Sequence, residues 1–227
     1  MTKLFFLNFL FSFSFLIGQT QNSIIENTDL SSVKIGSQLW TTQNLSVSTY
    51  RNGDVIPQVT DATKWSNLTT GAWCWYNNDS AANWQYGKLY NWFALNDARG
   101  IAPEGWHVPS DAEWNILIQE LDPATDTVCQ DCKQSMRAGG EMKEAGKNHW
   151  KRPNTGASNY SGFKDLPGGG RNGNGSFYGT RTYGYWWTST ENNVDFAWNR
   201  ALYCRSIGVL RTYSYKTLGY SIRLVKD

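Results

Sequence analysis

Short runs in which apolar and polar residues alternate make up most of the chain, and Gly, Asn and Thr interrupt them. Residues 33–40 (VKIGSQLW) predict a hairpin, because a Gly-Ser turn separates two alternating segments. Residues 73–76 predict another strand, which ends at the turn residues 77–79. These segments are typical of short antiparallel strands. Further strands are expected near the C-terminus, at residues 185–188, 196–203, 209–215 and 220–225.

Two segments carry the spacing of helices. Residues 86–96 (YGKLYNWFALN) place most of their apolar residues near one face and predict the first helix. The second helix is expected to begin after Ser110, which precedes Glu113 by three residues. That spacing is a capping box, in which the two side chains satisfy backbone donors that the first helical turn leaves unpaired. Apolar residues then follow at helical spacing up to Leu121, and Pro123 ends the helix.

The segment 161–177 (SGFKDLPGGGRNGNGSF) is rich in Gly, which adopts backbone angles that other residues avoid. It therefore predicts a long loop. It does not resemble a phosphate-binding loop, because it lacks the closing Lys-Ser/Thr of that motif and no helical pattern follows it. Two main helices, short antiparallel strands and long Gly-rich loops together predict an α+β fold.

The N-terminus carries an export pattern. Lys3 precedes an apolar run over residues 4–17, and a polar segment follows. A short positive start, a hydrophobic centre too short to span a bilayer and a polar exit are typical of a secretory signal peptide. An uncleaved anchor is the alternative. We predict a signal peptide at 1–19, a polar leader at 20–32 and one domain at 33–227.

The expected location of the protein follows from the same N-terminal pattern. No second apolar run of this length occurs, so we expect a secreted, cell-surface or periplasmic protein without a transmembrane segment after cleavage. The 21 basic and 19 acidic residues give a formal net charge of +2. The sequence shows no basic stripe or Lys/Arg block, which argues against a nucleic-acid partner.

Four cysteines in an oxidising compartment favour disulfides, and they allow three pairings. Cys129 and Cys132 are close enough in sequence for a small local bridge in a polar loop. Cys74 and Cys204 would then form the remaining pair and close a long loop. A redox-active pair is the alternative for the C-x-x-C, but its polar flanks lack the strand and helix start that such a pair uses.

The order of six segments carries a resemblance to a known family. They are IGSQLWTTQNL, YGKLYNWFAL, APEGWHVPSDAEW, GFKDLPGGGRNGNGSF, YWWTSTE and the closing YSIRLVKD. The stretch from about residue 33 to 227 resembles the Fibrobacter succinogenes major paralogous (FISUMP) domain of secreted bacterial proteins. HVPSDAEW and YSIRLV also resemble motifs of the formylglycine-generating-enzyme-like branch of C-type-lectin-like folds. The resemblance implies a C-type-lectin-like single domain with few regular elements.

The wider resemblance also raises an enzymatic alternative. The formylglycine-generating oxidase uses a pair of cysteines shortly before its closing strand, where this chain offers only Cys204. The resemblance therefore does not carry the copper-thiolate chemistry over to this chain. Of the two histidines, His107 stands two residues before Pro109, where we expect it to tie down a turn rather than act in catalysis.

Aromatic residues are abundant, with 12 Trp and 12 Tyr. Most are expected in the core, because each ring buries much apolar area. Aromatic rings beside amide and Arg groups also suit sugar binding, and adjacent strand residues face opposite ways, so one of Trp186 and Trp187 should face outward. The predicted ligand surface is Arg171, Asn172, Tyr183, Tyr185, Trp186 and Trp187.

Several oxygen-bearing side chains gather after the tandem Trp pair, and such groups are ligands for calcium. The weak calcium candidates are Glu191, Asn193, Asp195 and Asn199; no other cofactor is expected. The sequence thus predicts a secreted or surface-associated, non-catalytic binding or adhesion module for a glycan or another envelope protein. The alternatives are an oxidase of the formylglycine-generating type and a purely structural envelope protein.

Overall fold

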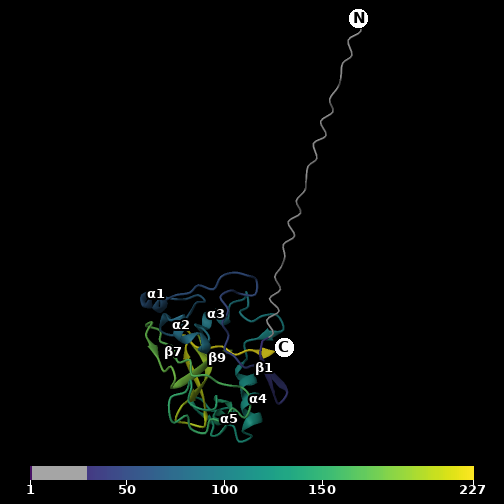
Figure 1. Cartoon of the computed structure of the whole chain (residues 1–227), viewed down its shortest axis with the longest axis vertical. Coiled ribbons are helices and arrows are strands. Elements are labelled where there is room, and N and C mark those ends of the chain that lie inside the picture. The colour runs from purple at the N-terminus through teal and green to yellow at the C-terminus, as the bar shows by residue number, and fades with distance from the viewer. Residues whose placement is uncertain (2–29) are drawn as a thin grey trace.

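The computed structural model describes Met1 and residues 30–227. The predicted signal peptide at 1–19, apart from Met1, and most of the polar leader at 20–32 lie outside the described residues. Figure 1 shows short helices and strands joined by long loops, so the predicted α+β class is confirmed. Within residues 30–227, no helix has the length and apolar character to cross a membrane.

Five helices occur in the described residues, and α4 is the longest, with 11 residues. The helices are α1 (Ala62–Ser66), α2 (Ser80–Asn83), α3 (Trp92–Leu95), α4 (Asp111–Leu121) and α5 (Ala138–Met142), with 3-10 turns η1 (Tyr76–Asn78) and η2 (Trp84–Tyr86). The strands are β1 (Ser32–Ile35), β2 (Gln38–Thr41), β3 (Trp73–Cys74), β4 (Leu89–Tyr90), β5 (Trp106–His107), β6 (Cys132–Ser135), β7 (Gly170–Arg171), β8 (Phe177–Tyr178), β9 (Tyr183–Glu191), β10 (Phe196–Tyr203), β11 (Val209–Tyr215) and β12 (Val225–Lys226).

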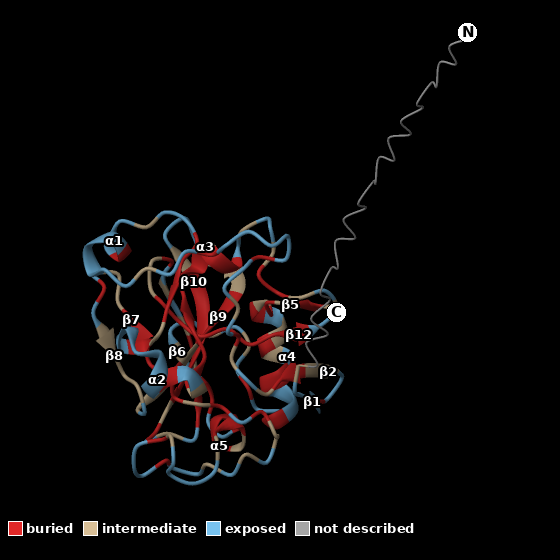
Figure 2. Ribbon diagram, turned by 45° about the horizontal axis from the view of Figure 1, so that its top comes forward, coloured by how far each residue is buried: buried red, intermediate tan, exposed pale blue. Residues whose placement is uncertain are grey.

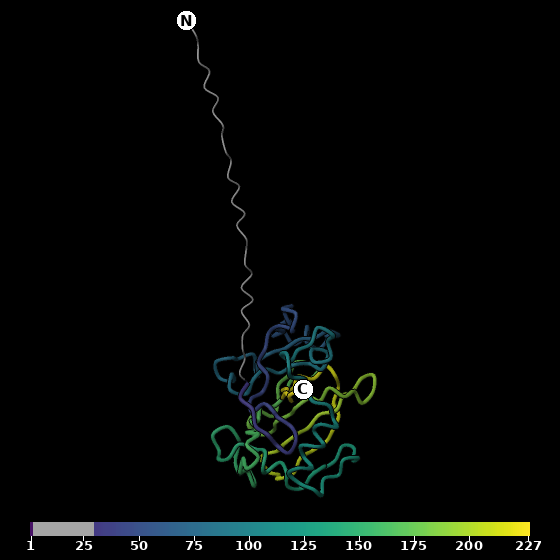
Figure 3. Tube along the Cα trace, turned by 90° about the vertical axis from the view of Figure 1, so that its right-hand side faces the viewer, coloured from purple at the N-terminus to yellow at the C-terminus, as the bar shows by residue number. Residues whose placement is uncertain are grey.

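Two four-stranded antiparallel sheets organise these strands. One has the order β1-β2-β12-β5, the other β6-β11-β10-β9, and β3-β4 and β7-β8 form two-stranded ribbons. The first sheet joins the two ends of the described chain, because β12 pairs with β2 through Val225 and Trp40. Figure 3 shows the yellow C-terminal end beside the purple N-terminal hairpin.

The predicted hairpin is confirmed. β1 pairs with β2 in a register that places Ile35 opposite Gln38, and Gly36 in the turn has a φ of 58°. A positive φ is costly for residues with a Cβ atom, so Gly36 explains why the chain reverses at this point. The strand β1 begins at Ser32, one residue before the predicted domain start.

The predicted capping box is also confirmed. The Ser110 hydroxyl accepts a hydrogen bond from the Glu113 amide at 3.2 Å, and the Glu113 carboxylate accepts one from the Ser110 amide at 2.8 Å. Helix α4 then buries Trp114, Leu117 and Ile118 against one core cluster. This helix is set by contacts within four residues, which explains why its pattern is readable from sequence.

The predicted helix at 86–96 is wrong. Gly87 has φ 73° and ψ −174°, which ends the turn η2, and Leu89 and Tyr90 pair as β4 with β3. A new helix, α3, starts only after Asn91, whose side chain accepts from the Ala94 amide. The same Asn91 oxygen accepts from the Ala72 amide at 2.9 Å. Pairing with a distant segment therefore outweighs the local helical spacing.

The C-terminal strand predictions are partly confirmed. The segments 196–203 and 209–215 are β10 and β11, and 185–188 lies within the longer β9. The predicted strand at 220–225 is wrong, because only its last residue belongs to β12. Tyr220 and Ser221 form isolated bridges to Tyr90 and Trp186 instead. The strand at 73–76 likewise stops at Cys74.

Aromatic rings fill the core, as predicted. Ten of the 12 Trp are buried, and Figure 2 shows buried residues along the central strands β9 and β10. Trp40, Trp114 and Phe163 form one mutual contact, with ring centroids 4.9 to 5.8 Å apart. Trp75 is half-buried, and Trp84 keeps 69% of its surface exposed. These two are the Trp side chains that are not fully buried.

Candidate functional site

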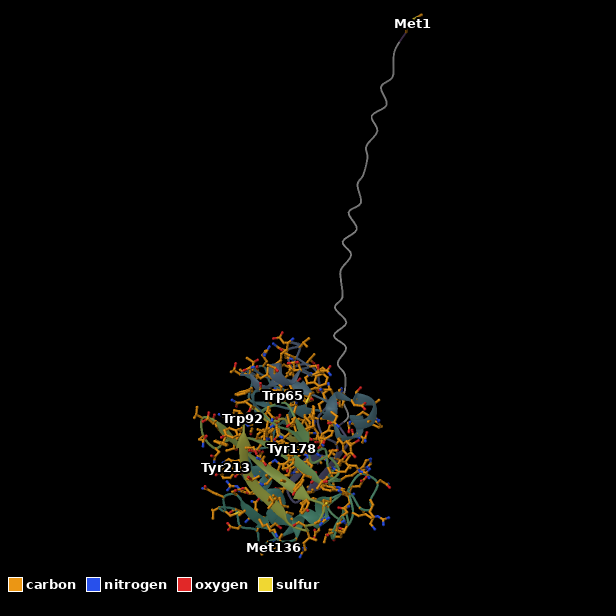
Figure 4. The ribbon with its side chains drawn as sticks, turned by 90° about the vertical axis from the view of Figure 1, so that its left-hand side faces the viewer. Met1, Trp65, Trp92, Met136, Tyr178 and Tyr213 are labelled. Carbon is orange, nitrogen blue, oxygen red and sulfur yellow. A yellow bond between two sulfur atoms is a disulfide. The ribbon has the colours of Figure 1, made fainter. Side chains whose placement is uncertain are left out.

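Arg171, predicted to read a ligand, is fully buried instead. Its guanidinium donates to the carbonyls of Val59 at 2.6 Å, Thr60 at 2.9 Å and Gly175 at 3.0 Å. It also lies 4.3 Å from the ring centre of Trp65, which Figure 4 labels. Arg171 therefore ties the glycine-rich loop to the segment before α1, and its predicted role in ligand binding is wrong.

Trp186 and Trp187 are both buried, so the prediction that one ring faces solvent is wrong. The Trp186 indole donates to the side chain of Asn44 at 2.9 Å, on one side of the sheet. The Trp187 indole donates to the Tyr90 carbonyl at 2.9 Å, and its ring packs on Tyr220. The sheet carries chain on both faces, so alternation along β9 exposes neither ring.

Tyr183 and Tyr185 are half-buried within a stack of tyrosines. Tyr203 stacks on Tyr183 with ring centroids 4.6 Å apart, Tyr183 on Tyr185 at 5.5 Å, and Tyr185 on Tyr220 at 4.7 Å. Tyr178, labelled in Figure 4, lies against the same stack. Neighbouring rings thus cover the aromatic faces of Tyr183 and Tyr185 on which a sugar would stack. The Asn172 amide bonds to Ser176 at 3.0 Å, within its own turn.

Three of the four calcium candidates, Glu191, Asn193 and Asn199, use their side chains in bonds to the protein, and the buried Asn199 oxygen has no partner. The carboxylate of Glu191 accepts from the ammonium of Lys216, and the Asn193 oxygen accepts from the amides of Asp195 and Phe196. Asn199 is fully buried on β10 and donates to the Ser214 hydroxyl at 3.0 Å. The ammonium group of Lys216 therefore lies beside the Glu191 carboxylate, where a bound calcium ion would have to lie.

The cysteines follow the predicted pairing only in part. Cys129 and Cys132 form a disulfide, with Cα atoms 6.0 Å apart. The predicted Cys74–Cys204 bridge is wrong, because both are free and buried in different core clusters. Burial raises the pKa of the Cys74 thiol to about 12, so it stays protonated at neutral pH. Neither free cysteine provides the paired thiolates of the oxidase alternative.

His107 has the structural setting that its position predicted. Its Nδ1 lies 2.6 Å from the Asp227 carboxylate, and its Nε2 lies 2.7 Å from the Glu113 carboxylate. The ring thereby joins the C-terminus to the capping box of α4. Partial burial opposes protonation of the imidazole, but the carboxylates of Asp227 and Glu113 outweigh it and raise the pKa of His107.

We expect this imidazole to make stability depend on pH. Because the folded-state pKa is raised, the contribution is fully present below the unfolded pKa of about 6.5 and is lost as pH rises through the folded-state value. The partly exposed ring limits the effect to less than about 1 kcal/mol. Urea unfolding at about pH 5.5 and about pH 8.5 should show the loss in the parent and not in His107→Gln. Equal losses in both proteins would contradict this role.

A groove runs along both sides of the segment 42–49, where no ligand residue was predicted. It consists of two adjoining cavities of about 440 Å³ and 670 Å³, which share Ser31, Gln43, Asn44 and Ser46. Such volumes fit the range of ligand-binding clefts. The larger cavity, called the Trp84 groove below, is lined by Ser31, Thr42, Gln43, Asn44, Ser46, Trp75, Trp84, Gln85, Gly87, His149, Lys164 and Leu166.

The side chain of Asn44 anchors the wall of the Trp84 groove by hydrogen bonds. Its amide nitrogen donates to the Tyr86 carbonyl at 2.8 Å, and its oxygen accepts from Trp186 at 2.9 Å and from Arg223 at 2.7 Å. Arg223 is fully buried, so this network holds the segment 42–49 against the core. The groove is therefore preformed on this side.

The aromatic walls come from the turns that flank α2. Trp75 precedes the turn η1 and packs its edge on Trp73, with ring centroids 5.9 Å apart. Trp84 opens the turn η2 directly after α2. His149 reaches the groove from a distant loop, where its Nδ1 lies 2.8 Å from the Glu144 carboxylate and its ring contacts Tyr86 edge-on.

Sequence reasoning missed Trp84, although a signal existed. Trp84 stands in the polar run NDSAANWQYG, without an apolar neighbour pattern that would bury it. Such a run predicts an exposed ring, and exposed apolar surface with a polar rim is typical of a binding site. Trp75 gave no such signal, because it lies in an apolar run that also forms β3.

One family model matches the chain. The model of the Fibrobacter succinogenes major domain covers residues 33–226, nearly all of the described residues. No curated protein and no solved structure matches the sequence. The match confirms the family that the six sequence segments indicated.

Proposed function

Since the chain belongs to the Fibrobacter succinogenes major domain family, we propose that its 33–226 domain is a non-catalytic binding module that holds a glycan in the Trp84 groove. The exposed Trp84 ring carries this proposal. With 69% of its surface in solvent, it contributes little to the core and offers an apolar face beside polar side chains. We include export through residues 1–19 and a secreted or cell-surface location in the proposal.

The composition of the groove supports a sugar ligand. An aromatic face stacks on the apolar face of a sugar ring, and amide and hydroxyl groups bond to its hydroxyls. The Trp84 groove combines two indoles with the amides of Gln43 and Gln85 and three hydroxyls. The α+β layout with long loops also supports the C-type-lectin-like assignment, which we keep as part of the proposal.

Replacing Trp84 with Ala should weaken glycan binding about tenfold or more, because a central aromatic anchor accounts for much of the binding energy of such sites. The exposed ring is not part of the core, so the unfolding midpoint should stay unchanged. A glycan array run with calcium and with EDTA identifies a bound oligosaccharide, and titration calorimetry then measures the dissociation constants.

The matched control is Tyr215→Ala, which removes an aromatic ring that is 57% exposed on β11, outside the groove. It should change the dissociation constant less than about twofold. Two results would contradict the proposal. One is an array on which the parent protein retains no glycan, and the other is equal affinity of the parent and the Trp84→Ala variant.

A further inference from the structure

A third cavity, called the basic pocket below, lies beside the Trp84 groove. It has a volume of about 660 Å³ and is lined by Lys147, Trp150, Lys151, Arg152, Thr180, Arg181 and Thr182. Four of these seven residues are basic and none is acidic. Within residues 30–227, none of the four basic side chains has a carboxylate within 4.0 Å.

The walls of the basic pocket are held in place by the core. Trp150 is 1% exposed, and its indole donates to the Asp165 carbonyl at 2.9 Å. The Arg181 guanidinium donates to the carbonyls of His149 at 3.2 Å and Asn148 at 3.4 Å. The Arg181 carbonyl accepts from the Lys151 amide at 2.6 Å. These bonds join the loops 147–152 and 180–182 into one wall.

One polar group of the pocket is unused. The Thr180 hydroxyl is buried and has no hydrogen-bond partner. A buried hydroxyl without a partner is uncommon in proteins. Positive side chains that gather without acidic partners raise the local concentration of anions, and Arg binds carboxylate, sulfate and phosphate oxygens in pairs.

The basic pocket is linked to the Trp84 groove by one hydrogen bond, although the two cavities share no lining residue. His149 lines the groove, and Arg181 of the pocket binds the His149 carbonyl. Lys164 adds a further positive charge to the groove. The Glu144 carboxylate on this side is 14% exposed and bonded to His149. One ligand of several sugar units would therefore meet aromatic rings and then cations.

We propose that the basic pocket binds the anionic groups of an acidic glycan, one that carries carboxylate, sulfate or phosphate groups along its length. This inference rests on the proposed function of the Trp84 groove. It assigns the ligand class: a neutral sugar ring lies in the groove, and the charged substituent of a neighbouring unit lies among Lys147, Lys151 and Arg152.

The test compares an acidic with a neutral oligosaccharide of the same length. The triple variant Lys147→Ala/Lys151→Ala/Arg152→Ala should bind the acidic oligosaccharide at least about tenfold more weakly and lose its salt dependence, with neutral binding unchanged. Arg181 is kept, because it holds the wall of the pocket. The control Lys34→Ala/Lys64→Ala/Lys133→Ala removes the same charge from exposed positions elsewhere and should change neither affinity.

The outcomes separate this inference from the proposed function. If the parent binds acidic and neutral oligosaccharides equally at low salt, or if the pocket triple variant loses no acidic affinity, the basic pocket is not the anion site, while the Trp84 groove stands. If no glycan binds at all, titration with inorganic sulfate decides: binding that the triple variant loses supports the pocket, and no binding overturns it. A single-stranded oligonucleotide that outcompetes the acidic glycan would overturn the assignment to a glycan.

Discussion

Replacing Asp111 with Ala is expected to lower the free energy of unfolding by about 3–5 kcal/mol, because it leaves two buried guanidinium groups without their counter-ion. Asp111 begins α4 and bonds to Arg200 at 2.6 Å and to Arg211 at 2.8 Å. The side chains of Arg200 and Arg211 are 1% and 9% exposed, so water cannot replace the carboxylate.

The effect should exceed that of any single surface charge, because this carboxylate joins α4 to the second sheet. Burial opposes ionisation of Asp111, but hydrogen bonds and charges from Arg211 and Arg200 outweigh it and lower the pKa. The carboxylate therefore stays ionised in the folded protein, and its contribution would be lost as pH falls through this lowered pKa.

Urea unfolding of the Asp111→Ala variant measures the loss directly. Glu104→Ala is the matched control, because Glu104 is exposed and should lose less than about 0.5 kcal/mol. A loss below about 1 kcal/mol for Asp111→Ala would mean that the two Arg side chains find other partners. The double variant Asp111→Ala/Arg211→Ala should lose less free energy of unfolding than the sum of the losses of the two single variants, because the two residues share one interaction.

Replacing Gly169 with Ala is the second change for which we expect a large loss of stability. Gly169 has a φ of 65°, and a Cβ atom there would lie 2.5 Å from both the Thr180 nitrogen and the Tyr178 oxygen. Both contacts are with backbone, which cannot rotate aside as a flexible side chain does. The Gly169 amide also donates to the Tyr183 carbonyl at 2.9 Å.

Gly105→Ala separates the two causes of this loss. Gly105 has a similar φ of 77°, but a Cβ atom there would meet nothing within 4 Å. Both variants carry the cost of a left-handed backbone, about 1–2 kcal/mol. The collision should add about 1–3 kcal/mol to Gly169→Ala alone. Equal unfolding midpoints in denaturant for the two variants would show that the backbone around Gly169 can move.

The elements that could be predicted from sequence depend on near neighbours. The capping box of α4 spans three residues, and the β1–β2 hairpin needs only a Gly-containing turn between two alternating segments. The segment 86–96 was misread because β4 pairs with β3, which lies about 16 residues earlier in the chain. The periodicity of the segment itself contains no information about such a distant pairing partner.

The predicted exposure of Trp186, Trp187 and Arg171 is wrong for a related reason. Side chains alternate between the two faces of a sheet, so one of two adjacent strand residues lies in solvent only when no other part of the chain covers one face. Asn44 covers the sheet at Trp186 and Tyr220 covers it at Trp187, so both rings are buried. An Arg beside aromatic residues suits sugar binding in the sequence, whereas the guanidinium of Arg171 satisfies three carbonyls inside the fold.

The sequence alone determined the family, the α+β class and the burial of most Trp rings, because these depend on motifs, composition and short-range contacts. Only the tertiary structure decided which rings face solvent and where cations gather. The basic pocket joins the loops 147–152 and 180–182, so no basic stripe is visible along the chain. Burial and charge at such a site depend on what the fold brings together, and a one-dimensional pattern does not contain that information.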